Sequence, residues 1–220
     1  MKKILVISAG RSDYDRYYPI INKLNNKKKI KLYVYLTKTH QDKKFGLTGN
    51  FVSKEFSIIK NKNITKKFND LSENFLEDLE YLIKKIRILK PEMLIVLGDR
   101  YEMLLGPISC IPKNIPIIHF YGGSVTEGAI DELVRHAITK MSHYHFVALK
   151  QYKHRLIQMG EESWRIKNIG VHSLNYIKSA KILTKKNLTK NLNFDFNKPY
   201  CLLTFHPVTL ELAKINLQLK

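Results

Sequence analysis

The stretch that decides the fold, Leu97–Val147, reads LGDRYEMLLGPISCIPKNIPIIHFYGGSVTEGAIDELVRHAITKMSHYHFV. Two apolar runs, residues 93–97 and 115–118, are followed at once by polar or ionisable residues, among them Asp99 and His119. A short apolar run that stops in this way is typical of a buried parallel strand with functional groups at its carboxyl end. Open α/β sheets bind ligands at that edge. The layout therefore favours an enzyme over a packing module.

Strands and helices alternate on both sides of this stretch. Apolar runs predict further strands over residues 3–7, 30–36, 55–59, 145–147 and 165–169. Helical spacing and capping signals predict helices over residues 12–24, 68–89, 102–110 and 151–159. Ser12 is the expected N-cap of the first helix, and residues 37–53 are expected to form a polar loop. This alternation predicts an α/β fold with a Rossmann-like, doubly wound parallel sheet.

The chain divides into three predicted parts. Residues 1–180 form an N-terminal Rossmann-like domain, and residues 181–198, rich in Lys, Asn, Leu and Thr with little periodicity, form a linker. Residues 199–220 open with a new buried-strand signal, Tyr200–Phe205, which has no partner strand in the remaining sequence. We therefore expect residues 199–220 to begin a second, truncated C-terminal nucleotide-binding domain.

Composition excludes several classes of protein. The net charge of +19 would suit a nucleic-acid-binding protein, but the lysines lie in scattered clusters without a recognition motif. No run is long enough to span a membrane, and the isolated cysteines Cys110 and Cys201 fit a reduced, cytoplasmic setting. His119, His143 and His145 do not have a zinc-ligand spacing. We expect neither a metal nor another cofactor.

Four motifs along the chain resemble one known family. They are residues 98–102, GDRYE; 119–123, HFYGG; 126–132, TEGAIDE; and 135–143, RHAITKMSH. Residues 10–14 and 204–209 match as well. Together they resemble the hydrolysing UDP-N-acetylglucosamine 2-epimerases of sialic-acid and related nonulosonate synthesis. The resemblance implies the first domain of a glycosyltransferase-B-type architecture, in which the active site lies between two Rossmann-like domains.

The resemblance also implies a reaction and its residues. A base removes the proton at sugar carbon 2, UDP leaves, and water adds to the resulting glycal to give N-acetylmannosamine. The catalytic candidates are Asp99, Asp131, Glu127 and His206. The substrate-binding candidates are Arg11, Arg100, His119, Gly122, Gly123, Arg135 and His136. Arg11 and Arg100 would face the diphosphate of a UDP-sugar, for which a guanidinium group is well suited.

Simpler readings of these residues stay open. Asp99 could cap a helix. Gly122 and Gly123 indicate a turn more directly than they indicate a phosphate site. Arg135 and His136 are expected to orient neighbouring groups rather than to take part in the chemistry. Many family members carry an acid or a histidine at the position of Tyr121, and an acid at that of Ser124.

Activity and assembly are open in the same way. The alternative function is a catalytically inactive, truncated fragment of the family, and we expect the 220-residue chain to be inactive alone. The chain could form a homo-oligomer or associate with a complementing C-terminal fragment, and the sequence leaves both alternatives open.

Overall fold

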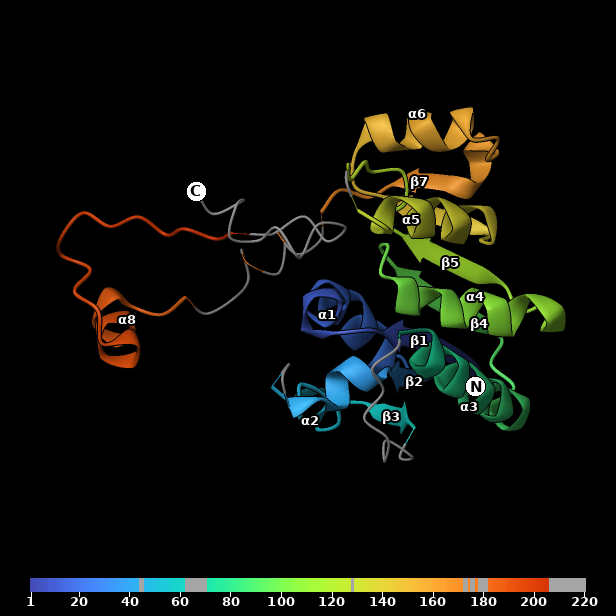
Figure 1. Ribbon diagram of the computed structural model, residues 1–220, viewed down its shortest axis with the longest axis horizontal. Coiled ribbons are helices and arrows are strands. Elements are labelled where there is room, and N and C mark those ends of the chain that lie inside the picture. Colours follow the sequence, from blue (N-terminus) through green and yellow to red (C-terminus); the bar gives the residue numbers. More distant parts are fainter. Residues whose placement is uncertain are drawn as a thin grey trace.

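The protein is built on one seven-stranded sheet in which every strand pairs with its neighbours in parallel, in the order β3-β2-β1-β4-β5-β6-β7 (Figure 1). The computed structural model describes residues 1–43, 46–61, 71–127, 129–171, 174, 177 and 182–205. The strands are β1 (Lys2–Ser8), β2 (Ile30–Leu36), β3 (Ser57–Lys60), β4 (Met93–Leu97), β5 (Ile117–Phe120), β6 (Tyr144–Val147) and β7 (Ile166–Asn168). The predicted Rossmann-like parallel sheet is confirmed.

Helices connect these strands. The α-helices are α1 (Arg11–Asn25), α2 (Gly49–Val52), α3 (Leu71–Leu89), α4 (Leu105–Cys110), α5 (Asp131–Lys140), α6 (Lys150–Gln158) and α8 (Lys185–Leu192). The crossovers from β1 to β2 and from β3 to β4 run in opposite directions along the sheet. Because such crossovers are right-handed, α1 and α3 cover opposite faces. The helices α3 and α4 pack beside one another on the same face of the sheet (Figure 1).

The core forms where helices cover both faces of the central strands. Residues 4–7 of β1 and 94–97 of β4 are all buried, as expected for strands that are covered on two sides. Tyr17 of α1 and Leu82 of α3 are completely buried against them. The strand order reverses between β1 and β4, so their carboxyl ends flank the switch point at which open α/β sheets bind ligands.

The first helix begins differently from the prediction. Its N-cap is Gly10, with extended backbone and no side-chain capping bond, so the expectation that Ser12 caps this helix was wrong. Asp13 instead turns back to the preceding loop, where its Oδ2 accepts a hydrogen bond of 2.7 Å from the Ala9 N–H. The amino end of α1 is therefore left without a side-chain cap.

Two connecting segments are more structured than expected. Residues 37–53, predicted as a polar loop, contain a 3-10 turn at Lys38–Gln41 and the helix α2. His40 is buried and its Nδ1 lies 2.8 Å from Thr48 Oγ1, which ties this turn to the segment before α2. The helix expected over residues 102–110 is divided into a 3-10 turn, Tyr101–Leu104, and α4.

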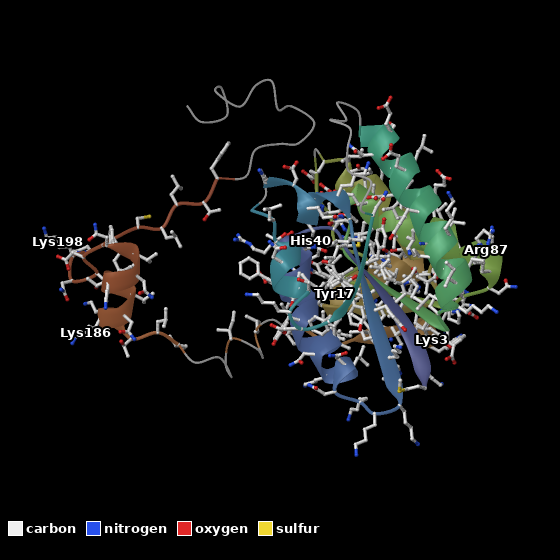
Figure 2. All side chains as sticks on the ribbon, turned by 90° about the horizontal axis from the view of Figure 1, so that it is seen from below. Lys3, Tyr17, His40, Arg87, Lys186 and Lys198 are labelled. Carbon is white, nitrogen blue, oxygen red and sulfur yellow. The ribbon has the colours of Figure 1, made fainter. Side chains whose placement is uncertain are left out.

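The segment 182–205 lies apart from the sheet. It contains α8, whose N-cap Thr184 accepts a hydrogen bond of 3.3 Å from the Asn187 N–H, so the predicted linker includes a helix. Tyr200–Phe205 is exposed and not in a strand, which contradicts the predicted element because its backbone pairs with no strand among the described residues. Figure 2 shows Lys186 and Lys198 in this outlying part and Tyr17 and His40 inside the sheet domain.

Candidate active site

The candidate site lies at the carboxyl edge of the sheet. Because all seven strands are parallel, the residues that follow β1, β2, β4 and β5 reach the same edge. Gly10 follows β1, His40 follows β2, Asp99 follows β4 and Tyr121 follows β5. The predicted placement of Asp99, His119 and Gly122 at one edge is thus confirmed, although His119 is within β5 itself.

Arg135 of α5 organises the centre of this edge. Its side chain is completely buried. Its Nε donates to Asp99 Oδ2 over 3.0 Å, and its Nη2 donates to the same oxygen and to Thr126 Oγ1, the latter over 2.6 Å. Its Nη1 donates to the Ser124 carbonyl over 2.8 Å and to Glu132 Oε2 over 2.5 Å. The guanidinium therefore makes five hydrogen bonds, which join Asp99, the loop before α5 and Glu132 of α5.

Asp131 is close enough to Asp99 for the two carboxylates to influence one another. Asp131 is the first residue of α5. Burial raises the pKa of Asp131, the negative charge of Asp99 raises it further, and Arg135 and Arg100 act in the opposite direction. A carboxyl group whose pKa is raised in this way holds a proton more readily than an ordinary aspartate, which suits a proton-transfer role.

Glu132 and His136 form a supporting pair on the same helix. Glu132 Oε2 accepts a hydrogen bond of 2.7 Å from the Thr126 N–H, and its Oε1 lies 2.9 Å from His136 Nε2. Burial alone would raise the pKa of Glu132, but the hydrogen bonds from Thr126, His136 and Arg135 lower it. His136 thus pairs with Glu132 of its own helix, and its expected contact with substrate stays a prediction.

His119 is a buried, neutral residue. Its Nε2 lies 2.8 Å from the Gly98 carbonyl and its Nδ1 lies 3.3 Å from Thr139 Oγ1. Burial lowers the pKa of His119 to about 3. With no exposed surface and both nitrogens engaged, the ring fixes Gly98 beside Asp99, and the direct substrate contact expected for it has no support from this geometry.

The pair Gly122 and Gly123 is required by packing. A Cβ on Gly122 would lie 3.0 Å from both His119 Nδ1 and Thr139 Oγ1. Gly123 has a φ of +82°, and a Cβ there would lie 2.6 Å from the Tyr152 carbonyl oxygen. The reading of this pair as a turn is therefore supported, and its substrate-binding role stays a prediction.

Arg100 faces the amino end of α1. Its Nη2 donates to Glu102 Oε1 over 2.7 Å and its Nε donates to Glu102 Oε2 over 3.2 Å. Its Nη1 lies 3.5 Å from the point where a Cβ on Gly10 would be. Arg11, the first residue of α1, is exposed. An uncapped helix amino end beside a guanidinium group is a suitable place for a phosphate.

The other two catalytic candidates contribute less to this picture. Glu127 is exposed in the loop before α5, and its role stays a prediction. His206 lies outside the described residues.

A buried polar network behind Gly10 was not identified as part of the site from the sequence. Ser8 Oγ lies 2.9 Å from His40 Nε2 and 3.1 Å from Asp13 Oδ2. Burial raises the pKa of Asp13 to about 6 and lowers that of His40 to about 4. His40 lies four residues after the end of β2, inside the turn Lys38–Gln41, so it lacks the signal that pointed to Asp99, which is a position close behind an apolar run.

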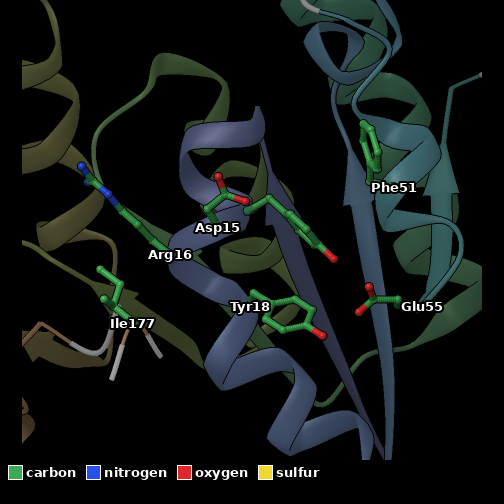
Figure 3. A pocket seen from close by; sticks show the side chains of 7 residues that line it. Asp15, Arg16, Tyr18, Phe51, Glu55 and Ile177 are labelled. Carbon is green, nitrogen blue, oxygen red and sulfur yellow. The ribbon is translucent and has the colours of Figure 1, made fainter. Parts of the chain in front are cut away.

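A separate pocket of about 540 Å³ lies between α1 and α2 (Figure 3). It is lined by Tyr14, Asp15, Arg16, Tyr18, Phe51, Glu55 and Ile177, none of which was predicted as a site residue. Among the residues described, no group of three His, Cys, Asp or Glu side chains could hold a metal ion. Nor does any helix in the described ranges have the length and apolar character needed to cross a membrane.

The fold and the edge residues define a Rossmann-like α/β domain with ionisable groups at the switch point of its sheet. Residues 22–218 match the sequence model of the family described as UDP-N-acetylglucosamine 2-epimerase, and the chain belongs to this family. The resemblance inferred from the motifs is thereby confirmed.

Two bacterial relatives cover the whole chain or nearly so. The GDP/UDP-N,N'-diacetylbacillosamine 2-epimerase (hydrolyzing) of Campylobacter jejuni is 37% identical over 233 residues, which are 100% of this chain and 58% of the relative. The UDP-N,N'-diacetylbacillosamine 2-epimerase (hydrolyzing) of Legionella pneumophila is 34% identical over 99% of this chain and 59% of the relative. The chain therefore spans less than two thirds of the length of these relatives.

Solved structures show the same fold at lower identity. The UDP-GlcNAc 2-epimerase of Neisseria meningitidis, bound to UDP-GlcNAc, superposes with a TM-score of 0.76 at 21% identity over 89% of this chain and 54% of that protein. The enzyme of Methanocaldococcus jannaschii in complex with UDP-GlcNAc and UDP gives a TM-score of 0.72 over 88% and 53%. The sheet thus corresponds to one Rossmann-like domain, the first, of a glycosyltransferase-B-type architecture.

Proposed function

We propose that this chain contributes the proton-transfer half of a hydrolysing 2-epimerase that acts on a UDP-linked 2-acetamido sugar. The observation that supports this most is the pair of carboxyl groups at the sheet edge. Asp99 is held by Arg135, and Asp131 has a raised pKa through burial and the charge of Asp99. Two neighbouring carboxyl groups can act as a base and an acid in one reaction.

In the proposed reaction one of these carboxylates removes the proton at sugar carbon 2. Asp99 is the candidate base, because two nitrogens of Arg135 hold its Oδ2 in a fixed position at the sheet edge. Electrons from the broken C–H bond form a C1–C2 double bond as the C1–O bond to UDP breaks. Water then adds its hydroxyl group to carbon 1, while Asp131, the candidate acid, gives a proton to carbon 2. The proton that the water loses returns to Asp131, and Asp99 releases the proton that it took to solvent. Glu127 and His206 are retained as further candidates for these proton transfers.

The departing diphosphate needs positive charge. Arg100 and the uncapped amino end of α1 supply it at one place, and Arg11 is the first residue of that helix. Stabilisation of a leaving diphosphate by such groups lowers the barrier to elimination. No cofactor is required for this sequence of steps.

The choice of sugar follows the names of the bacterial relatives described above. The motifs alone suggested UDP-N-acetylglucosamine and a product, N-acetylmannosamine, that feeds sialic-acid synthesis. The Campylobacter and Legionella relatives instead carry names that specify N,N'-diacetylbacillosamine. We propose the diacetamido sugar as the preferred substrate, in the cytoplasm, where nucleotide sugars are made.

The test is a chimera that fuses this chain to the part of the Campylobacter relative that its match does not cover. We expect the chimera to release UDP from the UDP-diacetamido sugar in D₂O and to incorporate deuterium at carbon 2. Asp131→Asn should reduce turnover by roughly 10²–10⁴-fold, the usual effect of losing a proton-transfer group. Glu162→Gln, an exposed acid paired with Arg165, is the matched control. A folded chimera that binds UDP but eliminates it from neither UDP-sugar would contradict the proposal.

A further inference from the structure

Asp13 is a buried acid with one unused oxygen. Its side chain is 4% exposed. Oδ2 accepts hydrogen bonds from the Ala9 N–H, over 2.7 Å, and from Ser8 Oγ, over 3.1 Å. Oδ1 is also buried, and the described part of the chain offers it no hydrogen-bond partner. Buried polar atoms are nearly always bonded, so this oxygen needs an explanation.

The unused oxygen points at the candidate phosphate site. A Cβ built on Gly10 would lie 3.7 Å from Asp13 Oδ1 and 3.5 Å from Arg100 Nη1. Both atoms therefore border the same small space over Gly10, at the uncapped amino end of α1. A helix amino end and an Arg attract an anion, whereas an ionised Asp13 at the same place would repel it.

We propose that Asp13 contacts a phosphate group bound over Gly10 and takes up a proton from solvent as that group binds. The new O–H bond forms at Oδ1, which then donates a hydrogen bond to a phosphate oxygen, and no bond of the ligand breaks. The carboxyl group thereby changes from a repulsive neighbour into a donor. That the phosphate is the diphosphate of a nucleotide sugar rests on the proposed function.

The surroundings of Asp13 favour this proton uptake. Burial raises its pKa to about 6, against the lowering effect of its hydrogen bonds with Ala9 and Ser8 and of the Arg100 charge. His40, which faces it through Ser8, is neutral because its pKa is about 4, and Tyr17 on the same helix stays protonated. A bound anion adds negative charge beside Oδ1 and raises the pKa of Asp13 further.

The experiment is calorimetric titration of the 220-residue protein with inorganic pyrophosphate between pH 5 and 8, in buffers that differ in ionisation enthalpy. Asp13→Asn is the key variant, because its amide can keep the bond to Ala9 and present an N–H where the protonated acid would present its O–H. At pH 7.5 we expect the wild-type protein to take up about one more proton than the variant. We also expect Asp13→Asn to bind pyrophosphate on the order of tenfold more tightly at pH 7.5, with the difference vanishing near pH 5.

Asp15→Asn is the matched control, since it removes the same charge from an exposed position on the same helix. The proposal is overturned if Asp15→Asn reproduces the effects of Asp13→Asn, if both variants match the wild type, or if the folded wild-type protein binds no pyrophosphate. A carboxyl ¹³C titration of the wild-type protein provides a second test that needs no variant to fold. There the pKa of Asp13 should rise when pyrophosphate is added, and an unchanged pKa would refute the contact.

These results are separable from the proposed function. Proton-linked pyrophosphate binding without UDP release by the chimera would leave the Asp13 site intact and refute the epimerase reaction. UDP release by the chimera, together with identical proton uptake by wild type and Asp13→Asn, would support the epimerase reaction and refute the Asp13 site.

Discussion

At the scale of single residues, Arg135 is the side chain on which the geometry of the candidate site depends most. It is buried, and its guanidinium links Asp99, Glu132, Thr126 and the Ser124 carbonyl. Removing one partner of a buried charged network leaves the others desolvated and unpaired, which is strongly destabilising. Asp99 and Glu132 remain partly exposed, so water can compensate for part of the loss.

We therefore expect Arg135→Met, which keeps most of the side-chain volume, to lower the free energy of unfolding by about 3 kcal/mol. The measurement is the urea unfolding midpoint, with Arg165→Met as control. Arg165 pairs with Glu162 over 2.7 Å at the surface, and loss of such a pair costs less than about 1 kcal/mol. Equal effects of the two substitutions would show that Arg135 does not hold the site together.

Single residues also show what the sequence could and could not predict about the site. Asp99 and Arg100 were identified because they follow an apolar run directly, and Asp131 because it lies in a long motif. Ser8 and His40 were missed, because a polar residue in a loop or at a strand end produces no periodic pattern, and their contact joins residues 32 positions apart. The engagement of both nitrogens of His119 was likewise set by packing that no local pattern reports.

At the scale of elements, the turn after β5 fixes how α6 packs against the sheet. Gly123 has a φ of +82°, and a Cβ there would collide with the carbonyl oxygen of Tyr152 and with the side chain of Leu156, each 2.6 Å away. Gly46 has a nearly identical φ of +80°, but a Cβ there would meet nothing within 4 Å. The two glycines therefore share the same backbone constraint and differ in close packing.

Comparison of Gly123→Ala with Gly46→Ala separates these two effects. The left-handed conformation should cost each variant about 1–2 kcal/mol of unfolding free energy. Gly123→Ala should lose a further 1–3 kcal/mol, because the Tyr152 carbonyl oxygen cannot move without displacing α6. Thermal and urea unfolding of both variants measure this difference. If the two variants lose the same stability, close packing at Gly123 contributes nothing.

The element predictions succeeded where burial imposes a pattern and failed where capping or local contacts decide. Strands β1, β2 and β4 were predicted to within a residue at each end, because each is a mostly apolar run with buried residues. The start of α1 was misassigned because Asp13 bonds to Ala9 in place of a cap at Ser12. Helix α8 was missed because its sequence, KKNLTKNL, has no wide apolar face, and its Thr184 cap was the one available signal.

At the scale of the whole molecule, the alternation of elements was enough to predict the parallel sheet, and the motifs were enough to predict the family. The division into residues 1–180, 181–198 and 199–220 stays a prediction. In the structure the segment 182–205 is almost entirely exposed, with Leu202 and Leu203 each 87% exposed. Apolar side chains in that state contribute almost nothing to the stability of the sheet domain.

Hydrogen exchange tests this division directly, because it reports the opening free energy of each segment. An isolated helix shorter than about 12 residues is marginal in water. The eight-residue α8 has no buried side chain, so we expect its amides to exchange almost as fast as those of an unfolded peptide. Helix α6 has nine residues, but it buries Leu156 against the sheet, so its amides should be protected many times longer. Mass spectrometry of peptides from 182–205 and from α6 and β4 provides the comparison. Protection of α8 equal to that of α6 would mean that the segment packs on the sheet domain, and the boundary near residue 180 would have to be abandoned.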